Sequence, residues 1–209
     1  SEMCIRDSIY VEGQADQRFL ADLLKTWYGY NLDRESKIRE DVQQVDIKVQ
    51  VSNGDSAFTE PKGWNNIKNS LKTSVEAGSK VLIILDADGK KKDDTTEEKS
   101  EKVRIRREIV KNTISNDITG FDFETQLYLW PNNQVPGTLE DLLETIINPD
   151  NQPILECWSS FEQCISSIPE KSLTLPANKT KIYAYLETLL GSTDSEKKKI
   201  KESNRDYTN

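Results

Sequence analysis

The sequence of 209 residues contains no histidine, and this absence removes several classes of active site. It excludes Ser-His-Asp and Cys-His nucleophile systems, a histidine general base, and every zinc site that uses imidazole. The three cysteines, Cys4, Cys157 and Cys164, show no C-x-x-C spacing, which argues against a disulfide framework and a four-cysteine zinc site. Any chemistry must therefore use carboxylates, lysines or hydroxyls, and we expect a reducing, cytoplasmic location.

Long apolar runs and glycine-rich phosphate loops are also missing. The longest strongly apolar run, Val81–Leu85, is far shorter than the ~20 residues of a membrane helix, so we expect no membrane span. Neither G-x-x-x-x-G-K-[ST] nor G-x-G-x-x-G occurs, which argues against ATP hydrolysis by this chain alone. The 28 basic and 36 acidic residues give a net charge of 28 − 36 = −8, so a phosphate-binding surface would have to be local.

Hydrophobic periodicity predicts strands that alternate with helices. The predicted strands cover residues 8–11, 46–51, 81–85 and 123–130, and the predicted helices cover 19–27, 64–75, 95–115, 138–147, 154–168 and 178–190. This order predicts an α/β fold with a mainly parallel four-stranded sheet, flanking helices and extra C-terminal helices. We expect one domain over residues 8–190, a non-native or disordered segment at 1–7, and a charged tail at 191–209 of an incomplete chain.

Acidic residues follow two of the predicted strands. Glu12 comes directly after the first strand, and Asp86 and Asp88 come after the apolar strand 81–85. If these strands are neighbours, the carboxylates meet at one sheet edge, where their mutual repulsion favours a divalent cation. Oxygen ligands favour Mg²⁺ or Mn²⁺ over zinc. The structural alternatives are a helix cap at Glu12, as we expect for Asp16, and an Asx-type turn at Asp86-x-Asp88.

Two joint motifs resemble a known family. The segment Ile9-Tyr-Val-Glu-Gly-Gln-Ala-Asp-Gln-Arg-Phe-Leu20, with Leu82-Ile-Ile-Leu-Asp-Ala-Asp88 about seventy positions later, resembles the Toprim domain. Toprim domains occur in primases, type II topoisomerases, small nucleases and overcoming-lysogenisation-defect (OLD) nucleases, and there one strand ends in Glu-Gly and another in Asp-x-Asp. Residues 129–143 and 179–186 are similar to small stand-alone OLD-type proteins. The resemblance covers Ile9 to about Leu190 and implies a Rossmann-like Toprim fold.

The resemblance also implies roles for individual residues. Glu12 matches the Toprim glutamate, which is a general acid/base or, in the nucleases, a metal ligand. Asp86 and Asp88 match the Asp-x-Asp that binds Mg²⁺. Many Toprim proteins have a third aspartate two places further on, but this chain has Lys90 there. The implied activity is metal-dependent cleavage of DNA or RNA by a nuclease in a defence or repair setting.

Later acids are candidates for the missing ligand. Glu140 and Asp141 occupy the first turn of the predicted helix 138–147, and later acidic residues complete the metal site in OLD-type nucleases. The structural alternative is that the helix dipole favours acids in a first turn whatever the function.

A nucleic acid must approach this acidic protein through a local basic patch. Arg104, Arg107 and Lys111 share one face of the predicted helix 95–115, whereas Arg106 lies off it. The interleaved glutamates also allow a plain solvated helix. The predicted nucleic-acid-binding residues are Lys90, Lys91, Lys92, Arg104, Arg107 and Lys111.

Two other functions stay open. One is a non-catalytic Toprim-like module that binds a partner protein, such as a separately encoded ATPase. The other is a haloacid-dehalogenase-type phosphotransferase with Asp86 as nucleophile, although Lys90 stands where that family has threonine. The sequence predicts no particular oligomeric state.

Overall fold

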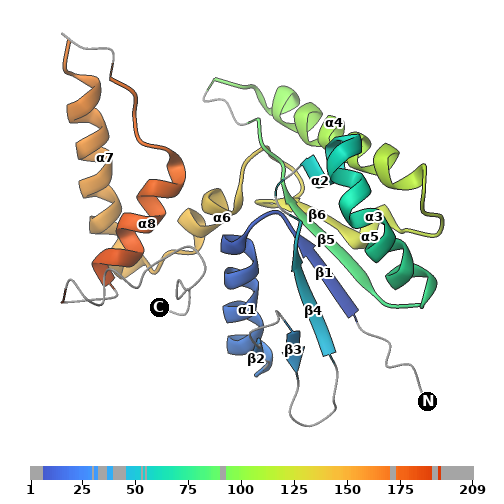
Figure 1. Cartoon of the computed structure of the whole chain (residues 1–209). Coiled ribbons are helices and arrows are strands. Elements are labelled where there is room, and N and C mark those ends of the chain that lie inside the picture. Colours follow the sequence, from blue (N-terminus) through green and yellow to red (C-terminus); the bar gives the residue numbers. More distant parts are fainter. Residues whose placement is uncertain are drawn as a thin grey trace.

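The computed structural model describes residues 7–29, 31–32, 37–39, 46–52, 54, 56–89, 93–169, 173–189 and 193. It shows an α/β fold built on a six-stranded sheet with the strand order β2-β3-β4-β1-β5-β6 (Figure 1). Four strands are parallel: β4 (Asp46–Val51), β1 (Asp7–Val11), β5 (Val81–Asp86) and β6 (Leu127–Trp130). Two short antiparallel strands, β2 (Asn31–Leu32) and β3 (Lys37–Arg39), extend the sheet beyond β4.

The pairing of β1 with β5 determines which strand ends lie side by side at the edge of the sheet. β1 pairs with β5 in parallel, with Val11 opposite Ile84, and on its other side β1 pairs with β4. The chain therefore passes from β1 to β4 on one side and then to β5 on the other, which makes the β1–β5 boundary a switch point of the sheet. In open parallel sheets, ligands bind outside the carboxyl ends of the strands at such a point. The predicted four-stranded parallel arrangement is confirmed.

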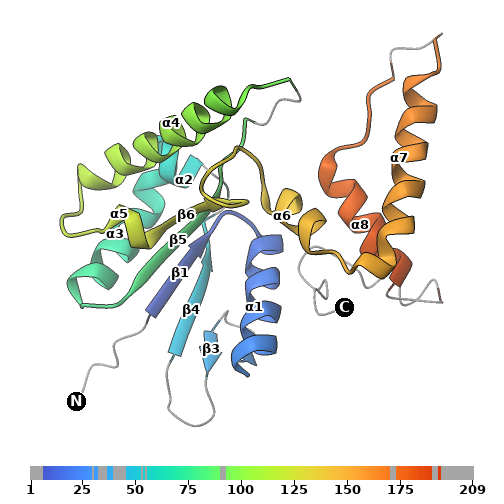
Figure 2. The same cartoon turned by 180° about the vertical axis from the view of Figure 1, so that it is seen from behind.

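Helices cover both faces of the sheet (Figures 1 and 2). One face carries α2 (Ser56–Thr59), α3 (Pro61–Glu76) and α4 (Thr96–Ser115), and the other carries α1 (Gln14–Tyr28) and α6 (Leu139–Ile146). Along β5, Val81, Ile83 and Leu85 point to the first face, while Leu82 and Ile84 point to the second. The strand is apolar without alternation because both of its faces are covered.

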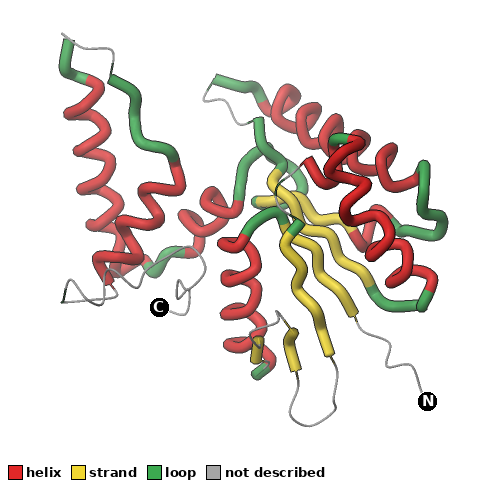
Figure 3. The backbone as a smooth tube through the Cα atoms, in the orientation of Figure 1, coloured by secondary structure: helices red, strands yellow, loops and turns green. Residues whose placement is uncertain are grey.

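The C-terminal helices form an arm beside the sheet (Figure 3). After α6 come η1 (Pro149–Asn151), α7 (Gln152–Ser166) and α8 (Asn178–Leu189), close to the predicted helices. Lys181 of α8 forms an ion pair with Glu144 of α6 at 3.0 Å, and Ile182 and Tyr185 belong to the core on the α1 face. Within the described ranges, no helix combines the length and apolar character needed to cross a membrane.

Two parts of the sheet differ from the prediction. β2 and β3 were missed because strands of two and three residues are too short to show an alternating pattern. The predicted strand over 123–130 is wrong in its first half, where α5 (Phe123–Gln126) forms instead. Its N-cap residue Asp122 accepts a hydrogen bond from the Glu124 N–H at 3.1 Å, so a local cap overrides the apolar pattern.

Candidate functional site

Glu12 follows the end of β1, and the turn after β4 fixes its position. The backbone N–H and the hydroxyl of Ser52 both donate to the Val11 carbonyl, at 2.8 and 2.9 Å. The Gly54 N–H donates to the carbonyl of Glu12 itself at 3.0 Å. Since β4 and β1 are paired along their length, these bonds determine where the Glu12 side chain starts.

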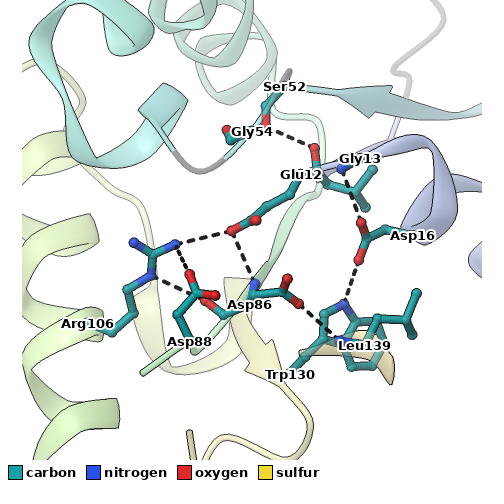
Figure 4. A network of polar contacts seen from close by, with 11 residues as sticks. Glu12, Gly13, Asp16, Ser52, Gly54, Asp86, Asp88, Arg106, Trp130 and Leu139 are labelled. Carbon is teal, nitrogen blue, oxygen red and sulfur yellow. Dashed lines mark hydrogen bonds and ion pairs between the residues drawn. The ribbon is translucent and has the colours of Figure 1, made fainter. Parts of the chain in front are cut away.

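The Glu12 carboxylate lies over the end of β5 (Figure 4). Its Oε1 accepts from the Asp86 backbone N–H at 3.2 Å and from Nη2 of Arg106 at 3.1 Å. Burial raises the pKa of Glu12 to about 7; Arg106 opposes the rise, and Asp88 adds to it. Two acidic residues separated by 74 positions therefore meet at the switch point.

The Asp86 carboxylate points to the α6 side of the sheet edge. Its Oδ1 accepts from the N–H of Leu139, the first residue of α6, at 3.0 Å. The pKa of Asp86 is raised to about 9, chiefly by burial and also by the carboxylates of Glu12, Asp16 and Asp88, while the Leu139 N–H opposes the rise. The metal-free site thus favours the protonated form of Asp86.

Asp88 lies on the α4 side of the same edge. Its backbone has a φ of 51°, in the left-handed region, and its N–H donates to the Gly137 carbonyl at 2.9 Å. Its Oδ2 lies 3.6 Å from Nη2 of Arg106. Arg106 therefore lies between Asp88 and Glu12.

Asp16 joins the site, although the sequence indicated only a helix cap. It does cap α1, since its Oδ2 accepts from the Gly13 N–H at 3.1 Å. Its Oδ1 accepts from the indole N–H of Trp130, at the end of β6, at 3.0 Å. Burial raises the pKa of Asp16 to about 6, and both hydrogen bonds oppose the rise.

A cavity of about 540 Å³ opens beside these acids. It lies between the ends of β1 and β5 and the first residues of α1, α6 and α8. Its charged lining consists of Glu12, Asp16, Asp86, Glu140 and Lys179. Because Lys179 is exposed, it offers positive charge at the edge of an acidic cavity.

The predicted pair Glu140 and Asp141 is split by the first turn of α6. Glu140 lines the cavity, and its Oε2 accepts from the Thr138 hydroxyl at 2.9 Å. Asp141 is absent from the lining: its Oδ2 accepts from the Thr138 N–H at 2.8 Å, as the acid of a capping box. Asp141 thus fits the structural alternative, an acid that stabilises the start of its helix, whereas Glu140 faces the site.

Of the predicted basic residues, the three that the structure describes, Arg104, Arg107 and Lys111, do not line the cavity. Lys90, Lys91 and Lys92 lie outside the described residues. Arg104 is paired with Glu101, with Arg104 Nε 2.7 Å from Glu101 Oε2, and Lys111 is exposed. Arg107 donates to the Phe123 carbonyl at 2.8 Å and to Asn133 Oδ1 at 3.1 Å, which ties α4 to its neighbours.

Arg106 contacts the site, although the sequence placed it off the helix face predicted to bind nucleic acid. Its position did contain a signal that it faces the sheet, because it lies three residues after Val103 and four before Val110, which form the buried stripe of α4. Lys179 carried no such signal, since only the packing of α8 brings it to the cavity.

The chain matches a protein family over residues 6–208, and the description of that family is "Protein of unknown function (DUF3226)". The chain belongs to this family. A search of curated proteins and a search of solved structures each find no match.

The donor set of this DUF3226 protein fits a hard divalent cation, because every candidate ligand is a carboxylate oxygen. Burial raises the pKa values of Glu12 and Asp86, so the metal-free site favours their protonated forms, and a bound divalent cation would favour the ionised ones. In the described part of the chain, however, no three acids or cysteines are grouped closely enough to hold an ion as they stand. Side-chain movement would have to bring the carboxylates together around Mg²⁺ or Mn²⁺.

Proposed function

We propose that the protein is a Mg²⁺- or Mn²⁺-dependent nuclease of Toprim type, with Glu12, Asp86 and Asp88 as its catalytic acids and metal ligands. One observation carries the proposal: the Glu12 carboxylate meets the end of β5 at the Asp86 N–H, 3.2 Å away, at the switch point of a parallel sheet. The order of the four parallel strands is compatible with a Toprim fold. Cytoplasmic location and a defence or repair setting remain part of the proposal.

The acids of the site suit phosphodiester chemistry. When bound, a divalent ion supplies Lewis acidity and lowers the pKa of a water molecule toward neutrality. Glu12, with its pKa of about 7, can accept or donate a proton near neutral pH. Glu140 is the later acid that lies in the cavity, so we include it in the metal site and leave Asp141 as a helix cap.

Positive charge for the substrate comes from Lys179 in this proposal. Lys179 lines the cavity and is exposed, so its ammonium group could reach a phosphate oxygen of DNA or RNA there and stabilise negative charge that develops at phosphorus. This local charge suits a protein whose net charge of −8 opposes binding elsewhere.

The first prediction concerns the two acids that meet at the switch point. Labelled DNA and RNA are incubated with Mg²⁺ or Mn²⁺ and the wild type, Glu12→Gln or Asp86→Asn. We expect each variant to reduce the cleavage rate by roughly 10²–10⁴-fold, because each loses an ionisable oxygen needed for metal binding or proton transfer.

The matched control is Glu124→Gln, which makes the same change on exposed α5, at the opposite end of the strands, and should cleave at the wild-type rate. Cleavage that survives both site substitutions would reject the assignment.

A partner-binding module is the second candidate, and the C-terminal arm favours it. Phe161 on α7 and Leu173 and Leu175 beyond it are 44%, 45% and 49% exposed, which is a high exposure for large apolar side chains. A wild type that cleaves neither DNA nor RNA with either metal, yet binds a separate ATPase through this arm, would support this function. A phosphorylated Asp86 together with monophosphatase activity would instead support a dehalogenase-type phosphotransferase.

A further inference from the structure

Arg106 contacts all three residues that we propose as metal ligands (Figure 4). Its Nη2 lies 3.1 Å from Glu12 Oε1 and 3.6 Å from Asp88 Oδ2, and its Nε donates to the Asp86 carbonyl at 3.2 Å. The Arg106 side chain is only 11% exposed. A single planar cation thus bridges the ends of the Glu12 and Asp88 side chains.

The fold places this guanidinium there. Arg106 lies on the stripe of α4 that buries Val103 and Val110 against the sheet. The start of α4 is tied to the loop after β5, because Lys102 donates to the Gly89 carbonyl at 2.9 Å and forms an ion pair with Asp94. Burial of a cation is costly unless opposite charges are close, and here Glu12 and Asp88 supply them.

We propose that Arg106 is an internal counter-ion that holds Glu12 and Asp88 in place in the metal-free protein, and that a divalent cation displaces its Nη2 from them. The inference rests on the proposed function, since it deepens the account of the same metal site. The oxygen that Arg106 contacts, Glu12 Oε1, also accepts from the Asp86 N–H, so a metal ion bound by this oxygen would lie close to the guanidinium. A metal ion and a guanidinium at this point would repel each other strongly.

Displacement need not remove Arg106 from the site. Its Nε bond to the Asp86 carbonyl does not involve the proposed ligand oxygens, so this bond can persist while Nη2 moves away. Arg106 would then be a positioning residue: it keeps the acids gathered before the ion arrives, at the cost of a lower affinity for that ion.

The test compares Arg106→Gln, Arg106→Lys and Arg104→Gln with the wild type. Melting temperature is measured in EDTA and in Mn²⁺, and Mn²⁺ affinity is measured by calorimetry. We expect Arg106→Gln to melt lower in EDTA and to bind Mn²⁺ about tenfold more tightly, because repulsion between charges a few ångströms apart has been removed. Arg104→Gln removes the same charge at an exposed position of α4 and should match the wild type.

Arg106→Lys decides the question if Arg106→Gln does not fold. A lysine keeps the charge but lacks the fork that contacts both carboxylates, so a smaller rise in Mn²⁺ affinity is expected. Unchanged or weaker Mn²⁺ binding by the folded Arg106 variants would overturn the inference.

Cleavage assays on the same proteins separate the two proposals. If the wild type cleaves but the Arg106 variants do not bind Mn²⁺ more tightly, the nuclease proposal stands and the counter-ion proposal is rejected. If the Arg106 variants bind Mn²⁺ more tightly but neither they nor the wild type cleave, the counter-ion proposal is supported and the nuclease proposal is rejected. Absence of Mn²⁺ binding in every protein overturns both.

Discussion

Individual carboxylates at the cavity differ in how their oxygens are used. Both oxygens of Asp16 accept hydrogen bonds within the protein, from Gly13 and Trp130, which suits a residue that shapes the site. Asp86 has one oxygen bonded to the Leu139 N–H. At Glu12, the contacts with Arg106 and with the Asp86 N–H both fall on Oε1. Glu12 and Asp86 therefore each have a second oxygen that could turn toward an ion.

Among the described residues that line the cavity, Lys179 is the only basic one, and Lys179→Ala tests its role. We expect the cleavage rate to fall about tenfold, because an exposed cation that faces the phosphate has been lost, while Mn²⁺ affinity stays within twofold of the wild type. The measurement is single-turnover cleavage with Mn²⁺ at saturation. Lys72→Ala on α3, a remote exposed lysine, is the control, and equal rates for the two variants would show that Lys179 takes no part.

At the level of elements, the start of α6 organises one wall of the site. Thr138 and Asp141 form the capping box of this helix. The capped helix start places the Leu139 N–H against the Asp86 carboxylate, and it places Glu140 at the cavity. The preceding residue has to be glycine because of a close approach: a Cβ at Gly137 would lie 2.6 Å from Asp141 Oδ2. The loop conformation and the helix start thus depend on each other.

Gly137→Ala should therefore disturb both stability and the site. We expect a loss of roughly 1–3 kcal/mol in the free energy of unfolding from the crowded Cβ, measured by urea denaturation. Mn²⁺ affinity should fall as well, because the Gly137 carbonyl accepts from the Asp88 N–H at 2.9 Å. Gly78→Ala, before the start of β5, should also lower stability but leave Mn²⁺ affinity intact. A Gly137→Ala protein with normal Mn²⁺ affinity would contradict this account.

For the molecule as a whole, the buried acids lie against a core that links the sheet to the C-terminal arm. On the α1 face, Val11 of β1 and Trp130 of β6 belong to the same apolar cluster as Leu155 of α7 and Leu186 of α8. Carboxylates at the end of such a core can ionise only at a cost, so the free energy of folding must depend on pH.

The metal-free protein should lose stability as pH rises. The folded pKa values of Asp86 and Glu12, about 9 and about 7, lie above their ordinary values of 3.8 and 4.5, so the folded state holds protons that the unfolded state releases. The stability contributed by these protons is complete below about pH 4 and is lost as pH rises toward about pH 9. Urea denaturation in EDTA across this range should therefore show a falling midpoint above about pH 5.

Mg²⁺ should reduce this fall, because the ion stabilises the ionised carboxylates of the folded state. Asp86→Asn should also flatten the dependence, since it removes the group with the largest rise in pKa. A midpoint in EDTA that stays level or rises between about pH 5 and about pH 9 would contradict the burial of these acids.

The sequence by itself was sufficient for features with a local or periodic cause. Alternation predicted β4 with its observed bounds, the run Val81–Leu85 predicted a strand covered on both faces, and Thr95 with Glu98 predicted the capping box that opens α4. The rule that parallel strands end at one edge also led to Glu12 and Asp86, because each directly follows an apolar strand.

Only the tertiary structure decided which side chains share the cavity. The entry of Arg106 and Lys179, the double role of Asp16 and the exclusion of Asp141 all depend on which helix faces meet the sheet edge. Periodicity reports the face on which a residue lies within its own helix, but not what lies opposite that face. Contacts between segments far apart in the chain arise from packing, so local patterns in the sequence do not encode them one by one.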